Sequence, residues 1–386
     1  MAKQKEHNPL PHVPRTIART RKDIKDWTTA LNMAEHIVTP QNWRLQQLFN
    51  LVAEDEMVLS QSRNRKLAVW SRDFVLKKKN GDIADDATKA IKSMSIFANT
   101  VNAIQDAELY WYSLIQLKQE ATGWTLEVLP RQNIVPQSGL FYPDFAIPYG
   151  GIAYRDLPEY RKTIFEIKST TPFGLLNSCT PKFLFKKFAL SCWSELCEIY
   201  GIPPRWMKTN TADTASLNRA DAMMRDMGAA AYFIIDENEE FGFAQGVQTN
   251  GDVYNNLIAE CKNAISLILS GAIIGQDTKN GSNSKEVASQ TITAKLVQAD
   301  IRTIQTHLNE GILEAFYNVG ILDDIYTIEY LDTEDIDQLW AMVKDLLPYY
   351  DFDPEYLLRK FGVEVLGKKA PATTATALSS GADFFV

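Results

Sequence analysis

Two long apolar segments on either side of a compact insert constrain this chain more than any other feature. The first runs from Lys182 to Gly201 and ends at the helix-breaking sequence Gly-Ile-Pro-Pro, and the second runs from about Asp252 to Gly271. Each segment makes a helix roughly 30 Å long at 1.5 Å per residue. Both are too apolar for helices that bury only one side, yet neither holds the ~18 uninterrupted apolar residues of a membrane span. We therefore expect helices that pack against copies of themselves.

The segments around these helices predict further structure. The insert contains a polar helical pattern, TADTASLNRADAMMRDMG, and two strand-like runs, AAAYFIID and EFGFAQ, that we expect to pair. A Gly/Ser/Asn/Lys-rich loop follows the second apolar helix, from Ile273 to Gln290, and a long helix is predicted from Thr291 to Val319. An acidic stretch, Asp323 to Asp337, leads to a predicted helix at Glu334 to Leu347.

The N-terminal half is a mixture of helices and strands. Residues 1–30 are polar and basic with three prolines, which predicts an extended arm. Helices are expected from Thr39-Pro40 onward, over 54–69, 85–97 and 100–109, with a strand at 70–78. A hairpin is expected over 109–129, and short strands follow to about residue 170. The overall class is therefore α+β.

Composition narrows the function classes. The chain has 386 residues and a net charge of −8, which allows two or three domains and argues against nonspecific binding of nucleic acid by a basic surface. The four cysteines fit no zinc pattern and indicate a reducing compartment. The polar N-terminus does not fit a signal peptide. P-loop, zinc-protease, nucleophile-elbow and dinucleotide-binding motifs are not found, so we expect no ATPase activity, cofactor or metal.

One pattern keeps an enzymatic alternative open. Asp144 follows a proline, and Glu166 and Lys168 lie two residues apart in a strand-rich stretch, as in the PD…ExK signature of metal-dependent nucleases. In that chemistry the two carboxylates would hold Mg²⁺ and the lysine would orient the attacking water. A half-exposed strand with a charge pair on one face explains the same residues, and we favour this structural interpretation.

The stretch from about Gly174 to Gly320 resembles the Mu-like family of phage portal proteins. The family's lysine-rich helix motif is matched by Lys186, Phe188, Ala189, Trp193, Leu196, Glu198, Tyr200, Gly201 and Pro203. The apolar strand of the insert is matched by Ala229 to Asp236, the loop motif by Gly275, Gln276, Thr278, Gly281 and Ser282, and an acidic position in the next helix by Asp300. Glu54 to Phe74 and the segment LPRQNIVPQSGLF resemble family segments that precede the stem. The resemblance covers about residues 40–365, but the chain is short after the third helix and its tail is unmatched.

This resemblance implies a portal fold. It would comprise an extended basic N-terminal arm (1–39), a wing (40–180), stem helix 1 (181–201), an α/β clip (202–251), stem helix 2 (252–272), a tunnel loop (273–290), a wing helix (291–330), a small helical crown (331–365) and a disordered tail (366–386). Portals are oligomeric rings, usually of twelve subunits, at one capsid vertex. The apolar faces of the stem helices would then be buried between subunits.

The resemblance also implies roles for particular residues. The tunnel loop would face DNA through Lys279, Asn280, Ser282, Asn283 and Lys285. The clip would dock partners through Pro203, Pro204, Arg205, Trp206 and Lys208, and the stem would pack through Phe188, Trp193, Leu196, Leu257 and Ile265. The implied partners are other copies of the chain, the major capsid protein, the terminase large subunit, head-tail adaptor proteins and double-stranded DNA. The implied function is a non-enzymatic channel for DNA packaging and ejection, assembled in the host cytoplasm and located in the virion.

Overall fold

The structure is a computed structural model, and it describes residues 15–121, 123–147, 149–201, 205–226, 232–240, 251–273, 283–331 and 336–347, with residues 349, 353 and 357. The chain divides into two compact units, residues 1–331 and 332–386. The second unit contains α11 (Ile336–Leu346), which agrees with the helix expected over 334–347.

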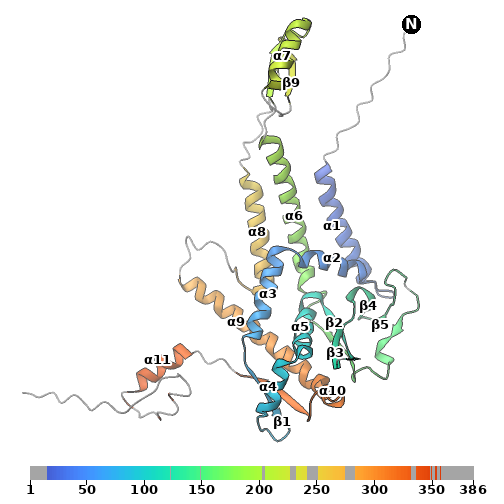
Figure 1. Ribbon diagram of the computed structural model, residues 1–386, viewed down its shortest axis with the longest axis vertical. Coiled ribbons are helices and arrows are strands. Elements are labelled where there is room, and N and C mark those ends of the chain that lie inside the picture. The colour runs from blue at the N-terminus through green and yellow to red at the C-terminus, as the bar shows by residue number, and fades with distance from the viewer. Residues whose placement is uncertain are drawn as a thin grey trace, which may run out of the picture. The chain divides into compact units, whose positions relative to one another are not determined.

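In the described part of the first unit, helices combine with four small sheets (Figure 1). Its helices are α1 (Arg15–Ala34), α2 (Trp43–Ala53), α3 (Glu56–Trp70), α4 (Asp85–Ser93), α5 (Ser95–Tyr110), α6 (Gly174–Gly201), α7 (Thr214–Asp226), α8 (Asp252–Ser270), α9 (Asn283–His307) and α10 (Leu313–Asn318). Its strands are β1 (Phe74–Lys78), β2 (Tyr112–Glu120), β3 (Gly123–Val128), β4 (Ile134–Val135), β5 (Leu140–Phe141), β6 (Ile152–Ala153), β7 (Ile164–Lys168), β8 (Arg205–Thr209), β9 (Tyr232–Asp236) and β10 (Tyr326–Tyr330). This mixture confirms the α+β class.

The sheets are mostly antiparallel. The predicted hairpin is confirmed as β2 and β3, and β7 pairs with the other edge of β2. β1 pairs with β10, so segments from the two ends of the unit lie side by side. β4, β5 and β6 form a second three-stranded sheet. β8 and β9 pair in parallel, which requires the crossover that α7 supplies.

The described residues of the unit form three hydrophobic cores. The largest joins β1, β2, β7 and β10 to α4, α5, α9 and α10, with Leu76, Ile115 and Phe316 completely buried. The second core joins α1, α2 and α3 to α6 and α8, around Phe49 and Ile265. The third and smallest surrounds Tyr112 and Tyr154. The helices α6 and α8, predicted as the stem, therefore also pack into the body of the unit.

Several predicted boundaries are wrong, each for an identifiable reason. The extended arm is incorrect for residues 15–34, because α1 is a helix whose Ala30 and Ala34 are buried in the second core. A single helix over 54–69 is incorrect at its start, because Asp55 is extended (ψ 133°) and caps α3. The helix that begins at Asp85 ends at Ser93, because Met94 is extended and separates α4 from α5.

The helices of the C-terminal half are longer than expected. α6 begins at Gly174 rather than at residue 181 or 182, and it therefore contains Pro181. Its first two turns pack into the body, where Leu176 and Cys179 are completely buried, and this packing explains the earlier start. α9 begins at Asn283, so residues 283–290 are helical rather than part of the predicted loop. β10 lies inside the acidic stretch that had suggested no strand. The predicted strand EFGFAQ beyond Glu240, the tail and residues 274–282 of the loop lie outside the described residues.

Candidate functional site

The two predicted stem helices lie side by side, with α6 leading to the insert and α8 returning from it (Figure 1). They meet at the insert end, where a Cβ on Gly251 would lie 3.3 Å from the indole nitrogen of Trp193. α6 has 28 residues and is therefore about 42 Å long at 1.5 Å per residue. The part of the chain that the structure describes contains no helix long and apolar enough to cross a membrane.

The predicted stem-packing residues occupy different environments. Phe188, Trp193 and Leu196 are partly buried within the chain. Ile265 is completely buried in the body core, so it packs inside one subunit and contributes nothing to a surface between subunits. Leu257 is 38% exposed and is available on the outside of α8.

A buried lysine joins the stem to the body. The side chain of Lys186 on α6 is 2% exposed, and its Nζ lies 2.5 Å from Asp55 Oδ2 and 2.8 Å from Glu56 Oε1. Asp55 also accepts two backbone N–H groups in the first turn of α3. Lys262 of α8 reaches Glu56 at 3.4 Å. Partial burial opposes ionisation of Glu56, but its hydrogen bonds and the positive charges of Lys186 and Lys262 together outweigh burial and lower the pKa of Glu56. The start of α3 is thereby tied to both stem helices.

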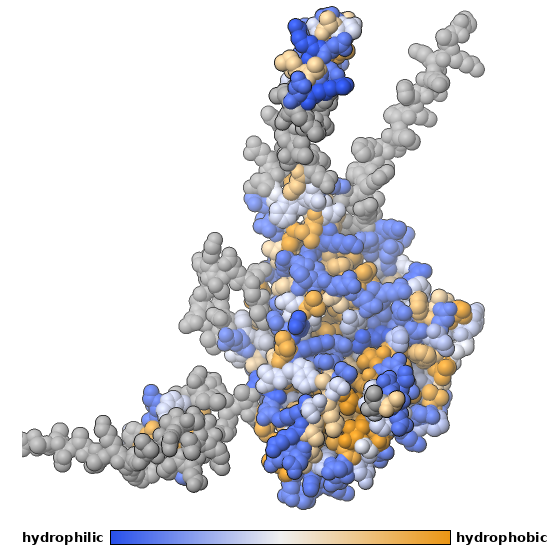
Figure 2. All heavy atoms as spheres, viewed as in Figure 1, coloured by the Kyte–Doolittle hydropathy of each residue, from blue (hydrophilic) through white to orange (hydrophobic). Residues whose placement is uncertain are grey.

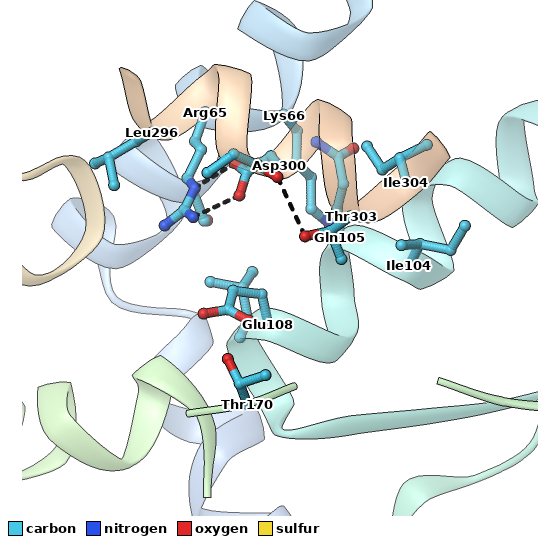
Figure 3. Close-up of a pocket in the computed structure, with 13 residues that line it drawn as sticks. Arg65, Lys66, Ile104, Gln105, Glu108, Thr170, Leu296, Asp300, Thr303 and Ile304 are labelled. Carbon is cyan, nitrogen blue, oxygen red and sulfur yellow. Dashed lines mark hydrogen bonds and ion pairs between the residues drawn. The ribbon is translucent and has the colours of Figure 1, made fainter. Parts of the chain in front are cut away.

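A second contact ties α3 to the end of α8 and to α9. Arg65 donates from Nε and Nη2 to both carboxylate oxygens of Asp300, each at 2.6 Å, and from Nη1 to the carbonyl of Leu269 at 3.1 Å (Figure 3). Burial opposes the charge of Arg65, but the hydrogen bond to Asp300 and the negative charges of Asp300 and Glu108 together outweigh burial and raise the pKa of Arg65. Such bidentate pairs fix geometry as well as adding energy. One side chain therefore holds α3, the last turn of α8 and α9 in register.

A cavity of about 260 Å³ lies beside this ion pair, between α3, α5 and α9 (Figure 3). Its charged groups already have partners: Arg65 pairs with Asp300, and Lys66 pairs with Asp106 at 2.5 Å. Glu108, on its floor, accepts hydrogen bonds from the hydroxyls of two residues that precede α6. The charged residues around the cavity therefore hold α3, α5 and α9 together.

The insert is a small βαβ unit, β8–α7–β9. Trp206 and Lys208 lie on β8 with exposed side chains, and Arg205 begins that strand, whereas Pro203 and Pro204 are outside the described residues. At the end of β9, Asp236 accepts from the backbone N–H and hydroxyl of Thr211. These hydrogen bonds, the hydroxyl foremost, lower the pKa of Asp236 to about 2.

The predicted tunnel-loop residues fall into two groups. Lys279, Asn280 and Ser282 are outside the described residues. Asn283 and Lys285 belong to the first turn of α9 rather than to a loop. The helical start of α9 therefore shortens the predicted loop at its C-terminal end.

The residues of the nuclease alternative do not form a metal site. Glu166 is engaged by Arg155, whose Nε and Nη2 donate to its two carboxylate oxygens at 2.9 and 2.7 Å, and this pairing raises the pKa of Arg155. Lys168 lies over the ring of Trp111, 5.0 Å from its centroid. Asp144 accepts from a backbone N–H in its own turn. Among the residues that the structure describes, no three His, Cys, Asp or Glu side chains gather as metal ligands. The structural interpretation of these residues is the one that the geometry supports.

Sequence reasoning missed the two stem attachments. Lys186 and Asp300 belong to the motifs that carried the resemblance, but their partners Asp55 and Arg65 lie 131 and 235 positions away along the chain. The only local signal was Asp55 itself, an acidic residue at a helix start, which is a common N-cap. Spacing along the sequence carries no information on contacts at such separations.

The comparisons with known proteins agree with this architecture. The family model of the portal protein of Mu bacteriophage matches residues 46–363. The portal protein of Escherichia phage Mu is 25% identical over 145 residues, which cover 36% of this chain and 28% of that protein. The chain thus aligns with little more than a quarter of the length of that relative.

Two solved structures are similar in fold. One is the neck of an empty gene transfer agent (GTA) particle, and the other is the virion of a native gene transfer agent particle. Each superposes with a TM-score of 0.51 at 13% identity, over 88% of this chain and 99% of the other. The family match extends over most of the sequence, including both stem helices and the body that anchors them. The chain therefore belongs to the family of portal proteins of Mu bacteriophage.

Proposed function

We propose that this chain is the subunit of a portal ring at one vertex of a capsid, through which double-stranded DNA is packaged and later ejected. The observation that carries the proposal is the pair of long stem helices, α6 and α8, which join the βαβ insert to a body that anchors them through Lys186 and Arg65. Because the chain belongs to the portal family, we assign this arrangement the function of a portal. No step of this function needs catalysis by the chain.

The surface of the stem supports assembly. Leu190 on α6 is 46% exposed, and Val253 and Leu257 on α8 are 60% and 38% exposed. In the view of Figure 2, apolar residues interrupt the polar surface along the stem helices. A soluble monomer gains nothing from such residues, whereas a ring buries them between subunits. The similar GTA neck structure was computed with C6 symmetry, which is consistent with repeated subunits around an axis.

The remaining parts take roles within the ring. The insert is the clip, where Trp206 and Lys208 are available to dock the terminase or an adaptor protein. The tunnel loop predicted over 273–290, of which residues 283–290 begin α9, takes the role of facing DNA. The body is the wing, in contact with capsid protein. A net charge of −8 suits a channel, because each phosphate neutralised by a basic residue adds affinity and slows passage.

The proposal is tested by electron microscopy of the purified chain, together with its mass in solution. We expect closed rings with a central channel and a mass near twelve times 43.6 kDa. Glu166→Ala should form the same rings and leave their mass unchanged, because Glu166 binds Arg155 and Tyr160 within its own subunit. A chain that remains monomeric at high concentration, under conditions in which its capsid protein assembles, would contradict the proposal.

A further inference from the structure

The outer face of α8 is an unpartnered stripe of apolar and acidic residues. Residues that face the body and α6, including Cys261 and Ile265, are buried. Between about 60° and 120° around the helix from that buried face, Val253, Leu257 and Glu260 are exposed. This stripe runs along α8 from the end near the insert toward the body.

α6 has a matching outer face. In its upper half, Trp193 and Leu196 are partly buried, and Trp193 lies against Gly251 at the start of α8. Between about 60° and 120° around the helix from Trp193, Lys187, Leu190 and Ser194 are exposed at helical spacing. In the described residues neither Lys187 nor Glu260 has an ion-pair partner. The helix pair thus presents two different exposed surfaces, one basic and apolar on α6, the other acidic and apolar on α8.

The heights of these residues along the stem follow from two contacts. Lys186 and Lys262 both reach Glu56, so these two positions lie at one level. Trp193 and Gly251 are in contact near the clip, which fixes a second level. The helices run in opposite directions, so each step up α6 corresponds to a step back in the numbering of α8.

Counting from these contacts pairs the two faces. The Lys186–Lys262 level places Lys187 at residue 261, and the Trp193–Gly251 level places it at residue 257, so Glu260 lies between the two. By the same count, Leu190 lies level with residues 254–258, which include Leu257, and Ser194 lies level with residues 250–254, which include Val253. A basic residue is therefore level with an acidic one, and each exposed apolar residue on α8 is level with a leucine or a small residue on α6.

In a cyclic ring, residues at the same level on neighbouring subunits can come into contact. A rotation about the ring axis moves a residue around the ring without changing its height, and a closed ring needs two different surfaces that meet head to tail. We infer that the outer face of α6 packs against the outer face of α8 in the neighbouring subunit, with Lys187 beside Glu260, Leu190 beside Leu257 and Ser194 beside Val253. This inference rests on the proposed ring, with the stem along its axis, and names the surface that closes it.

Cysteine cross-linking of the full-length chain tests this register. Cys192 and Cys197 are first replaced by serine, while Cys179 and Cys261 are buried and remain. Ser194→Cys combined with Val253→Cys should form disulfides on oxidation with copper phenanthroline, giving a ladder of covalent multimers on a non-reducing gel. A disulfide needs Cα atoms within about 7 Å, which packed helices allow at level positions.

The matched control moves one cysteine along the same face. Ser194→Cys with Leu267→Cys separates the two positions by about 21 Å along the stem, at 1.5 Å per residue, and should give no ladder. If electron microscopy shows rings but the control pair cross-links and the level pair does not, the register is wrong while the proposed function stands. If the unaltered chain forms no ring, the proposed function fails and the inference fails with it.

Charge exchange provides an independent readout. Lys187→Glu places like charges together at every interface and should lower the fraction of chain in rings by at least about tenfold at a fixed concentration. Adding Glu260→Lys should restore the rings, because the pair is then reversed rather than removed. Loss of rings in the double variant, with the helical content of the chain unchanged, would overturn the pairing.

Discussion

Replacing Lys186 with methionine removes the charge that neutralises Asp55 in the joint between stem and body. The Asp55 side chain is 3% exposed, and loss of one partner of a buried ion pair typically costs 3–5 kcal/mol. Asp55 keeps two backbone N–H donors, which places the expected loss for Lys186→Met at the lower end, about 3 kcal/mol. The measurement is urea unfolding of the unassembled chain, read as a shift of the midpoint at constant slope.

Two further variants separate the charge from the packing. Lys89→Met, on the exposed surface of α4, removes a helical lysine without an ion pair and should stay within about 0.5 kcal/mol of the unaltered chain. Asp55→Asn combined with Lys186→Met should be more stable than Lys186→Met alone, because asparagine still caps α3 and carries no charge. The reasoning would be refuted if Lys186→Met cost no more than Lys89→Met, or if the double variant lost the sum of the two single changes.

Three further predictions concern other contacts. Arg65→Lys loses the bidentate geometry and should destabilise the chain by about 2–4 kcal/mol in the same urea assay, whereas Arg63→Lys, on the exposed side of α3, should be neutral. Burial lowers the pKa of His307 below its ordinary value of 6.5, so the unfolded chain takes up this proton more readily than the folded chain. The free energy of unfolding is therefore highest above pH 6.5 and decreases as the pH falls toward the folded pKa of His307. Unfolding between pH 7.5 and 5.5 should therefore depend less steeply on pH in His307→Gln, by at most about 1.4 kcal/mol per pH unit, and an unchanged slope would contradict this. Gly174→Ala should lower the melting temperature strongly, because φ is +73° and the new Cβ would lie 2.4 Å from the carbonyl oxygen of Leu109; a variant as stable as the original would be inconsistent with this backbone.

The parts of the fold that the sequence predicted well are those that local pattern decides. α8 was predicted almost residue for residue, since Gly251 and Gly271 flank an apolar helix and both adopt the left-handed conformation. The β2–β3 hairpin followed from alternation around Gly123. In both places the local preferences and the packing favour the same structure.

The parts that were missed depend on contacts with distant segments. α1 looked like an extended arm because of its basic, proline-preceded sequence, but Trp27 donates to Asn177 and holds the helix against α6. β10 is a strand because β1 lies beside it, and an acidic segment alone gives no sign of this. Arg65 and its partner Asp300 could not be joined by spacing, since nothing local marks a pair so far apart.

The pairing of β1 with β10 has a consequence for biosynthesis. The two strands are joined across about 250 residues, as the hydrogen bond from Thr327 to the carbonyl of Lys77 shows. At translation rates of roughly 5–20 residues per second, β1 waits about 12–50 s for its partner to be made. Phe74 and Leu76, which are buried in the finished protein, have no sheet to cover them during that interval. The edge of β1 that later pairs with β10 therefore stays unpaired while residues 79–325 are translated, and it can join another strand edge during that interval.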